Sequence, residues 1–525
     1  MIKEIDLVIH PDDIFDTGRI QSTILHQEKI DKQQLSHFVI RKRSIDARSR
    51  QVVYRLKVLL YIGEDFTPTI FHSNYKNVKD AQPVIIVGAG PAGLFAALRL
   101  IELGLKPIIL ERGKDVKQRR RDLAAINKHG MINSESNYCF GEGGAGTYSD
   151  GKLYTRSDKR GDVNKMLQIL VAHGATEDIL VDARPHIGTN KLPQIISAIC
   201  DTILNAGGEV HFDTKLTDIN IKDNAIKSAI TNNGVFEATS IILATGHSAK
   251  DIYYLLREKN VLLEAKPFAL GVRIEHPQNI IDQSQYHCPT RHQNLPPSYY
   301  SLVTQVQDRG VFSFCMCPGG IIAPCATNEN EIVVNGWSPS KRNNPFANSG
   351  TVVQINLNDV KGHEANPFAL LDFQTAIENK AYQAGGGSLK APAQRMVDFV
   401  NHKTSQNLPD NSYLPGLTSA NLHDVLPSFI ANRLKEALPQ FGKKIPSVFG
   451  NAGYYTNESV LVGVESRTSS PLRIPRDKET LQHPQIKGLF PCGEGAGYAG
   501  GIISAAIDGQ ACADAIVKMN NFKGL

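Results

Sequence analysis

The sequence feature that most constrains the fold of this chain is a glycine-rich turn between an apolar strand and an apolar helix. Residues 83–113 read PVIIVGAGPAGLFAALRLIELGLKPIILERG. A short apolar run, a turn, a helix-length run and a second short apolar run predict a parallel β-α-β unit. Gly88, Gly90 and Gly93 form the pattern G-x-G-x-x-G in the turn. The segment therefore predicts a fold that binds a dinucleotide where the helix begins.

Each glycine of this turn has a separate physical task. Gly88 makes the tight turn, Gly90 lets the main chain approach a diphosphate, and Gly93 lets the helix pack closely on the strand. Free N–H groups and the helix dipole favour phosphates at the helix N-terminus. Glu111 ends the second strand, at the spacing of an acid that accepts hydrogen bonds from a ribose hydroxyl.

Two later segments indicate FAD rather than NAD. SIILATG (Ser240–Gly246) resembles the ATG element of the glutathione-reductase-type FAD fold, which lies along the nucleotide half of the cofactor. LFPCGEGAGYAGGIISAA places Gly493 and Glu494 after a strand and a helix start near Ile502. The resemblance implies that the Gly-acid pair, in which Glu494 replaces the usual Asp, contacts the ribityl chain or a phosphate. The following helix would aim its N–H groups at the flavin.

A third glycine cluster, FGEGGAGTYSDGKLYTR (Phe140–Arg156), follows the first β-α-β unit. Its glycines permit close approach to a diphosphate or a flavin ring, and Thr147 and Ser149 offer hydrogen-bond donors. The alternative is a mobile surface loop. The full set of predicted cofactor residues is Gly88, Gly90, Pro91, Ala92, Gly93, Glu111, Arg112, Gly143, Gly144, Gly146, Thr147, Leu216, Ala244, Thr245, Gly246, Gly493, Glu494, Gly500, Gly501 and Ile502.

Taken together, the chain resembles the uncharacterised FAD-dependent dehydrogenase family of bacteria. The resemblance lies in ERGKDV, FGEGGAGTYSDGKL, RPHIGTNKL, FALGVRIEHP, FCMCPGG, APAQR, ESRTSSPLRI and GEGAGYAGGI, and RKRSIDAR extends it into the first unit. It covers most of the chain and implies the fold and FAD. It implies no substrate.

The chain length and the changes in composition along the chain predict several domains, because 525 residues are too many for one compact core. The fold class is α/β: a glutathione-reductase-type FAD-binding Rossmann domain with an inserted antiparallel-sheet substrate domain and a small α+β N-terminal domain. In the N-terminal unit, a helix opening at Pro11 follows a first strand and precedes two β-rich runs. The predicted ranges are the N-terminal domain at 1–80, the first part of the FAD-binding domain at 81–263, the inserted domain at 264–424, and a returning helix with the C-terminal FAD-binding part at 425–525.

The sequence singles out no catalytic acid or base, because flavin N5 supplies the hydride chemistry. Tyr148, Lys152, His247 and Arg395 are the candidates. Two groups of polar residues offer clamps for an anionic substrate: Lys390, Gln394 and Arg395, and Arg467, Ser469, Ser470 and Arg473.

The cysteines carry no metal pattern, since no second pair at ligand spacing accompanies the C-x-C of Cys315 and Cys317. Small buried apolar side chains are the expected role of this pair, and a thiol relay is the alternative. Cys139 lies next to the third glycine cluster, so the loop could bring it to the cofactor.

The sequence reveals no targeting or membrane-spanning segment in the chain. The N-terminus lacks the apolar run of a signal peptide and no membrane-length apolar run occurs, so a cytoplasmic location is expected.

Basic clusters at 41–57 and 117–121 indicate a solvated face or an anionic partner, without a nucleic-acid motif. The leading hypothesis is an FAD-dependent oxidoreductase for a small, anionic molecule, with NAD(P)H as a transient donor. The alternatives are an FAD enzyme acting on tRNA and a non-catalytic flavin-fold binding protein. The oligomeric state stays open.

Overall fold

The dinucleotide segment lies at the centre of a parallel sheet. The computed structural model describes residues 1–68, 71–155, 160–450 and 452–523. In it β4 (Pro83–Val87), α2 (Pro91–Leu103) and β5 (Lys106–Leu110) follow one another along the chain. The full sheet has the order β22 (Leu489–Pro491), β10 (Ile241–Leu243), β4, β5 and β6 (Glu209–His211), with every pair parallel.

Both faces of this sheet are buried, as expected for parallel strands. Ile86 and Ile242 belong to the cluster formed with the helices on one face, and Ile85 and Ile241 belong to a second cluster on the other. The first face is covered by α2, α4 (Val163–Ala172), α6 (Leu192–Asn205) and α13 (Ile502–Lys523). The second carries α7 (Lys250–Glu258) and the small sheet of β7 (Leu216–Lys222), β8 (Ala225–Thr231) and β9 (Gly234–Glu237).

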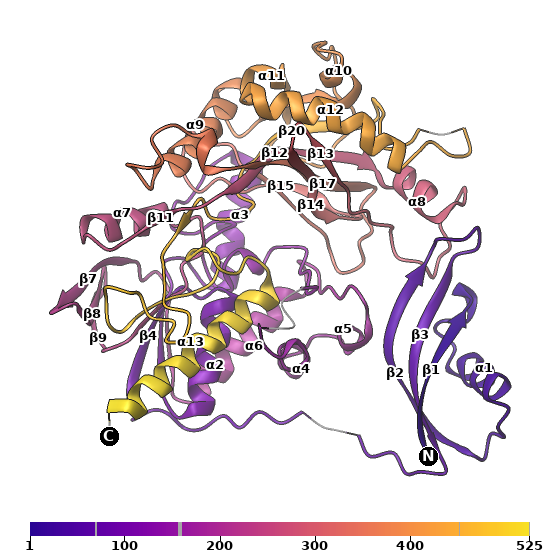
Figure 1. Ribbon diagram of the computed structural model, residues 1–525, viewed down its shortest axis with the longest axis horizontal. Helices are drawn as coiled ribbons and strands as arrows, with labels where there is room; N and C mark the ends of the chain where they lie inside the picture. Colours follow the sequence, from indigo (N-terminus) through magenta and orange to yellow (C-terminus); the bar gives the residue numbers. More distant parts are fainter. Residues whose placement is uncertain (69–70, 156–159, 451, 524–525) are drawn as a thin grey trace.

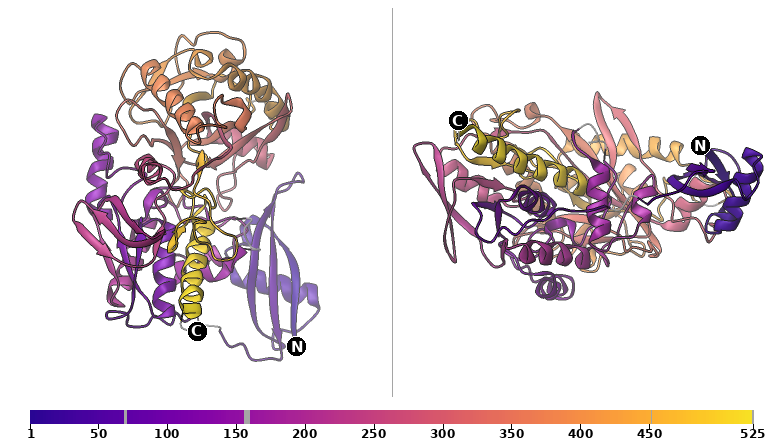
Figure 2. Two further views of the ribbon diagram at one scale, coloured as in Figure 1. Left: turned by 60° about the vertical axis from the view of Figure 1, so that its left-hand side comes forward. Right: turned by 90° about the horizontal axis from the view of Figure 1, so that it is seen from below.

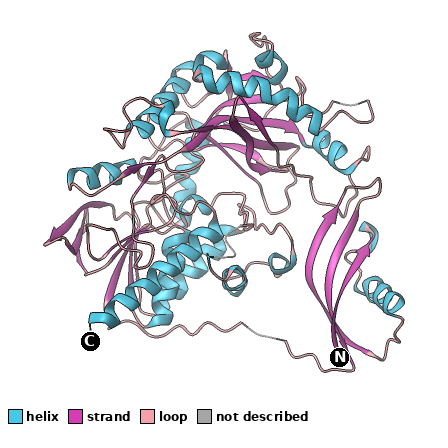
Figure 3. Ribbon diagram, viewed as in Figure 1, coloured by secondary structure: helices cyan, strands magenta, loops and turns pink. Residues whose placement is uncertain are grey.

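A seven-stranded sheet forms the upper layer of Figure 1. Its order is β13 (Val303–Val306), β14 (Arg309–Cys317), β17 (Phe346–Ile355), β12 (Phe268–Pro277), β20 (Val460–Glu465), β18 (Ala391–Arg395) and β19 (Leu417–Ser419). All pairs are antiparallel except β18 with β19, so the sheet is mixed rather than purely antiparallel. Helices cover its outer side (Figure 3): α9 (Ala369–Ala384), α10 (Met396–Val400), α11 (Leu422–Val425) and α12 (Ser428–Lys444).

The boundary expected at residue 424 does not coincide with the end of this layer. The helix expected to lead back to the parallel sheet is α12, and its apolar side chains Ile430, Leu434 and Phe441 lie fully buried in the cluster of the seven-stranded sheet. The wholly buried β20 pairs with β12 and β18 inside that sheet. A helix face and a strand that are this apolar need a large partner surface, and the seven-stranded sheet supplies it.

The first 62 residues form a separate unit on the right of Figure 1, and Figure 2 shows it standing beside the two larger layers. β1 (Ile2–Ile9), β3 (Val53–Ile62) and β2 (Leu35–Asp46) make an antiparallel sheet that α1 covers. The helix expected from Pro11 begins only at Thr17 and ends at Glu28, because Asp16 caps it by accepting a hydrogen bond from the Arg19 N–H.

This unit is docked on the rest of the chain by polar contacts and by the burial of Tyr286 and Leu295 in its apolar core. Arg43 bonds to Asp182 (2.7 Å) and Asp178 (2.8 Å) beside α5 (Asp178–Val181), and the Tyr54 hydroxyl donates to the Asn294 carbonyl at 2.6 Å. Other cations of the 41–57 cluster also have acidic partners: Arg48 and Arg55 with Asp46, and Lys57 with Glu4. These pairs neutralise part of the basic surface on which the tRNA alternative depends.

The remaining elements connect these layers: α3 (Val116–His129), α8 (Gln278–Tyr286), β11 (Glu264–Ala265) with β21 (Leu472–Arg473), and β15 (Ile321–Pro324) with β16 (Val334–Trp337). Within the described ranges, none of the helices has both the length and the apolar composition needed to cross a bilayer.

A buried histidine in β12 predicts an acid-sensitive fold. His276 is fully buried, and its Nε2–H donates to the Tyr454 carbonyl at 2.8 Å, while Nδ1 has no partner. Burial lowers the pKa of His276 to about 4. Between the ordinary histidine pKa and this value the unfolded chain binds the extra proton, so stability is lost as pH falls from ~6.5 to ~4.

We expect His276 to cost the wild-type protein about 2 kcal/mol of stability between pH 7 and pH 5. His276→Gln keeps a donor and cannot titrate, so its unfolding midpoint should fall less over the same range. Urea unfolding of both proteins at the two pH values measures the difference. Equal losses in the two proteins would exclude His276 as the source.

Candidate functional site

A cavity opens at the carboxyl ends of β4, β10 and β22. The carboxyl ends of parallel strands meet at one edge of a sheet, so the turns that follow the three strands come together there although they are far apart in sequence. The opposite wall comes from the seven-stranded sheet and from β16. Of the predicted cofactor residues, the cavity is lined by Gly88, Gly90, Pro91, Ala92, Glu111, Gly144, Gly146, Ala244, Thr245, Gly246, Gly493, Glu494, Gly500, Gly501 and Ile502.

The three glycines of the first turn are required for different reasons. Gly88 has a φ of +106°, and a Cβ there would lie 2.4 Å from the Ala244 carbonyl oxygen. A Cβ at Gly93 would lie 2.0 Å from the Gly88 carbonyl oxygen. At Gly90 the nearest atom to an added Cβ is the Gly144 Cα at 4.0 Å. Packing thus requires Gly88 and Gly93, whereas a side chain at Gly90 would occupy open space in the cavity.

Two helix N-termini flank this cavity. α2 begins after Gly90 with no side-chain cap, and α13 begins at Ile502, which also lines the cavity. The helices cross closely, since a Cβ at Gly509 would lie 2.0 Å from the Ala92 carbonyl oxygen. Free N–H groups and two positive dipole ends in one place favour a bound anion.

Glu111 joins three segments around the cavity. Its buried carboxylate accepts hydrogen bonds from the N–H groups of Ala89 (2.8 Å), Gly113 (2.9 Å) and Gly141 (2.9 Å). Glu111 therefore has a structural role, and its ribose-binding role stays a prediction that is compatible with it, because each carboxylate oxygen can accept more than one hydrogen bond.

The third glycine cluster packs on the first turn. The Gly143 N–H donates to the Ala89 carbonyl at 2.9 Å, and the Thr147 hydroxyl donates to the Glu142 carbonyl at 2.6 Å. Gly143 and Thr147 therefore shape the loop and do not line the cavity, whereas Tyr148, Ser149 and Lys152 do. Arg156, at the end of the cluster, lies outside the described residues.

Arg119 holds this loop in place, which the sequence did not reveal. The chain places it among exposed basic residues, but its side chain is fully buried. Its guanidinium donates to the carbonyls of Asn137 (2.8 Å), Glu142 (2.9 Å), Tyr138 (3.0 Å) and Gly144 (2.9 Å). The expected solvated face at 117–121 is thus wrong for Arg119, because four loop carbonyls replace water around it.

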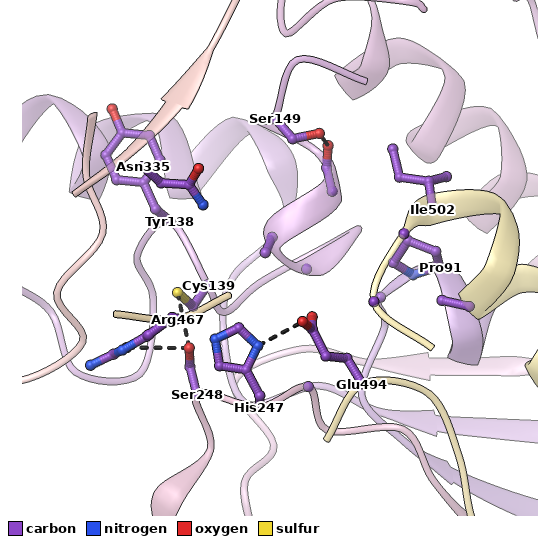
Figure 4. Close-up of a pocket in the computed structure, with 18 of the residues that line it drawn as sticks. Pro91, Tyr138, Cys139, Ser149, His247, Ser248, Asn335, Arg467, Glu494 and Ile502 are labelled. Carbon is purple, nitrogen blue, oxygen red and sulfur yellow. Dashed lines mark hydrogen bonds and ion pairs between the residues drawn. The ribbon is translucent and has the colours of Figure 1, made fainter. Parts of the chain in front are cut away.

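His247 and Glu494 meet across the cavity floor (Figure 4). The His247 Nδ1 lies 3.2 Å from the Glu494 carboxylate, so the turns after β10 and β22 are joined by a polar contact. The other ring nitrogen, Nε2, is buried and has no hydrogen-bond partner. A buried polar atom without a partner at a cavity wall indicates where a ligand atom would bond.

Arg467 lines the cavity but has no free N–H for a substrate. Its guanidinium donates to five acceptor atoms, which use all five of its N–H groups: Ser248 Oγ, Thr327 Oγ1, both oxygens of Glu378 and one of Glu331. Lys250 completes this buried ion cluster. Figure 4 shows Ser248 between Arg467 and Cys139, whose sulfur accepts from the Ser248 hydroxyl at 3.4 Å. The prediction that Arg467 binds an anionic substrate directly is therefore wrong.

Other predicted residues lie away from the cavity. Arg395 bonds to Asn407 and to the Asn457 carbonyl. Arg112 pairs with Glu135 and Asp251. The predicted site residues outside the cavity lining are Gly93, Arg112, Gly143, Thr147, Leu216, Arg395, Lys390, Gln394, Ser469, Ser470 and Arg473. These residues belong to the predicted motifs or lie near them in sequence, but in the folded chain they lie outside the cavity lining.

The inserted layer supplies residues that motif reasoning missed. Asn335 and Trp337 of β16 line the cavity, and the Trp337 Nε1 is buried without a partner. Tyr138 and Cys325 also reach it. Cys315 lines it too, although it lies far along the chain from the dinucleotide elements. Antiparallel strands carry no sequence motif for ligand binding, so this wall of the cavity could be identified only from the fold.

A group of metal-type ligands adjoins the cavity, which Cys492 lines. Ligand atoms of Cys492, Asp508 and Cys512 lie within 4.8 Å of one another. Asp508 already pairs with Arg476 (2.6 Å) and accepts from the Gly493 N–H (2.8 Å). Because the Asp508 carboxylate is already paired with Arg476 and with the Gly493 N–H, we assign the cluster a structural role in holding the turn at Gly493.

Family models match three parts of the chain. An FAD binding domain matches residues 81–131, the FAD-dependent protein, C-terminal domain-like family matches residues 267–468, and a domain of unknown function matches residues 1–61. The second range runs from the start of β12 to just beyond β20, the strands of the seven-stranded sheet.

One relative is similar over nearly the whole chain. A protein of Clostridium beijerinckii, described as uncharacterized, is 38% identical over 524 residues, covering 96% of both chains. Among solved structures, a glycine oxidase from Bacillus cereus is 14% identical with a TM-score of 0.29, over 84% of this chain and 96% of that one. A flavoprotein/dehydrogenase from Cytophaga hutchinsonii is 11% identical with a TM-score of 0.35, over 84% and 79%.

Proposed function

Because this chain belongs to the family of the Clostridium beijerinckii protein, a family of FAD-dependent oxidoreductases, we propose that its cavity transfers hydride between FAD and a small molecule. The cofactor is held in a glutathione-reductase-type arrangement, and the small molecule binds against the inserted sheet. The observation that carries the proposal is the convergence of three glycine-rich turns and two helix N-termini on one cavity.

The residues present fit FAD. A Cβ at Gly90 would enter the cavity, the α2 N-terminus is uncapped, and the His247 Nε2 lacks a partner. Gly88, Gly90 and Glu111 would hold the nucleotide half, and Glu494 and Ile502 the flavin half. When bound, FAD supplies hydride chemistry at its N5 atom.

The chain's own side chains bind and orient the small molecule and exclude water. Phe314, Val334 and Trp337 supply apolar surface on the inserted wall, and the Trp337 Nε1 offers a donor. Lys152 also lines the cavity, where it pairs with Asp150 at 3.2 Å, and the anionic character of the small molecule stays a prediction from the sequence. Arg467 acts by keeping Ser248 and the loop around it in place.

Anaerobic reduction of the bound flavin, followed at its visible absorbance band, tests this function. NADH, NADPH and a panel of carboxylic acids are the donors. Bleaching by a nicotinamide alone identifies a reductase that binds it transiently, and bleaching by an acid alone identifies a dehydrogenase. A protein that retains no FAD after reconstitution would overturn the proposal.

A variant of the inserted wall tests where the small molecule binds. Asn335→Leu should slow flavin reduction by the effective donor by about tenfold to a hundredfold, since a lost polar contact costs ~1–3 kcal/mol. Reduction by dithionite should not change. Asn401→Leu, at an exposed position outside the cavity lining, is the matched control. Equal rates in all three proteins would place the substrate elsewhere.

A further inference from the structure

Two cysteines of β14 lie where this strand is irregular and borders the cavity. The register of β14 against β17 shifts between Phe314 and Cys317. Cys315 has a φ of +47°, a conformation that residues other than glycine seldom adopt. Cys315 lines the cavity, whereas Cys317 behind it is fully buried. Irregularities of this kind next to active sites re-aim a side chain.

Lys152 and the two thiols are in direct contact. The Lys152 Nζ lies 3.6 Å from the Cys315 sulfur and 3.3 Å from the Cys317 sulfur. The distance between the two sulfurs therefore cannot exceed the sum of these two distances. The Cys317 thiol donates a hydrogen bond to the Cys315 carbonyl at 3.4 Å, and its side chain also interacts with that of Cys315. A disulfide between them requires the two sulfurs to approach to about 2 Å.

Positive charge around the pair exceeds negative charge, and burial raises the pKa of Glu465 to about 7, which reduces the negative charge further. Three cations surround the pair against two carboxylates: Lys152, Arg273 and Arg342 against Asp150 and Glu465. Burial lowers the pKa of His186 to about 4, so this nearby ring is neutral. A thiolate at Cys315 offsets this excess of positive charge, and unbalanced buried charge is costly.

The two thiols differ in acidity. The hydrogen bond from Cys317, together with Lys152 and Arg273, outweighs burial and holds the pKa of Cys315 well below its usual range. Burial raises the pKa of Cys317. One thiol is thus a thiolate that borders the cavity and the other a protonated neighbour, which is the division of roles in thiol–disulfide exchange.

We propose that Cys315 and Cys317 form a reversible dithiol–disulfide pair that exchanges with a low-molecular-weight disulfide entering the cavity. The Cys315 thiolate attacks one sulfur of the small disulfide, which breaks its S–S bond, forms a mixed disulfide and releases one thiolate. Cys317 then attacks the Cys315 sulfur, and its proton leaves with the second small thiol. The protein pair is oxidised by two electrons and the small disulfide is reduced by two.

Trapping of the mixed disulfide on the FAD-loaded protein tests the exchange. With glutathione disulfide, the wild type should lose the mass of two hydrogen atoms and acquire a Cys315–Cys317 crosslink. Cys317→Ser should retain one glutathione on Cys315, and Cys315→Ser should retain none on Cys317. Cys325→Ser, at another cavity cysteine, should behave as the wild type. Absence of both the crosslink and the trapped adduct would overturn the proposal.

Alkylation kinetics provide a second readout. At pH 7, peptide mass spectrometry should show Cys315 reacting with iodoacetamide at least about tenfold faster than Cys288. Cys288 is also partly exposed, but burial raises its pKa. Equal rates would contradict a thiolate at Cys315.

Lys152 is a positioning residue in this pair. Lys152→Met should move the midpoint of the pH–rate profile for Cys315 alkylation to higher pH, and Lys152→Arg should restore much of the shift. A purely structural lysine would leave this midpoint unchanged. The flavin absorbance of each variant is recorded separately, so failure of the thiol exchange is distinguishable from failure of FAD binding.

Discussion

Replacing Gly90 with valine is expected to give a folded protein that no longer retains FAD. Gly90 has a φ of −74°, which any residue adopts, and an added Cβ meets no atom closer than 4.0 Å. The valine side chain would instead occupy the space next to the N-terminus of α2, where we propose that the diphosphate binds. Overpacking costs ~1–3 kcal/mol and each lost hydrogen bond to a charged group ~1.5–3 kcal/mol. FAD affinity should fall at least about a hundredfold.

The FAD content of the purified protein, read from the visible absorbance after heat release, measures this effect. Gly310→Val is the matched control, because an added Cβ there meets only side-chain atoms, the nearest at 3.6 Å, and Gly310 lies outside the cavity lining. The control should retain the wild-type amount of FAD. A full flavin complement in Gly90→Val would show that the diphosphate does not lie at this turn.

Arg119→Met is expected to destabilise the glycine loop and thereby both folding and FAD retention. Methionine fills much of the volume of arginine but donates no hydrogen bond, so four loop carbonyls lose their partner. Buried acceptors without partners cost ~1–3 kcal/mol each, in part recovered by water. We expect a loss of roughly 3–5 kcal/mol in the free energy of unfolding, at the upper end of single substitutions.

Urea unfolding and limited proteolysis measure this change, with cleavage expected within residues 133–150. Arg120→Met removes the neighbouring exposed arginine and should change stability by no more than about 0.5 kcal/mol. Similar behaviour of the two variants would mean that Arg119 does not hold the loop.

Local patterns predicted the elements around the cofactor well. The helix expected after the glycine turn is found at Pro91–Leu103, and the helix start expected near Ile502 is found at that residue. The FAD prediction is confirmed by the family matches. Turn glycines and apolar periodicity act over a few residues, so they are readable without the fold. The boundary at 424 could not be read in this way, because β20 joins its sheet through partners more than 60 residues away in sequence.

The sequence by itself determined that a parallel β-α-β unit with three turn glycines would bind a dinucleotide, because the steric demands of that turn are local. Only the tertiary structure decided what the polar and sulfur-containing side chains do. Arg119 is buried by loop carbonyls, Arg467 is saturated by Glu331 and Glu378, and Cys315 meets Lys152 from a segment 163 positions away. The ionisation and accessibility of these groups depend on partners that packing assembles, and no local pattern records them.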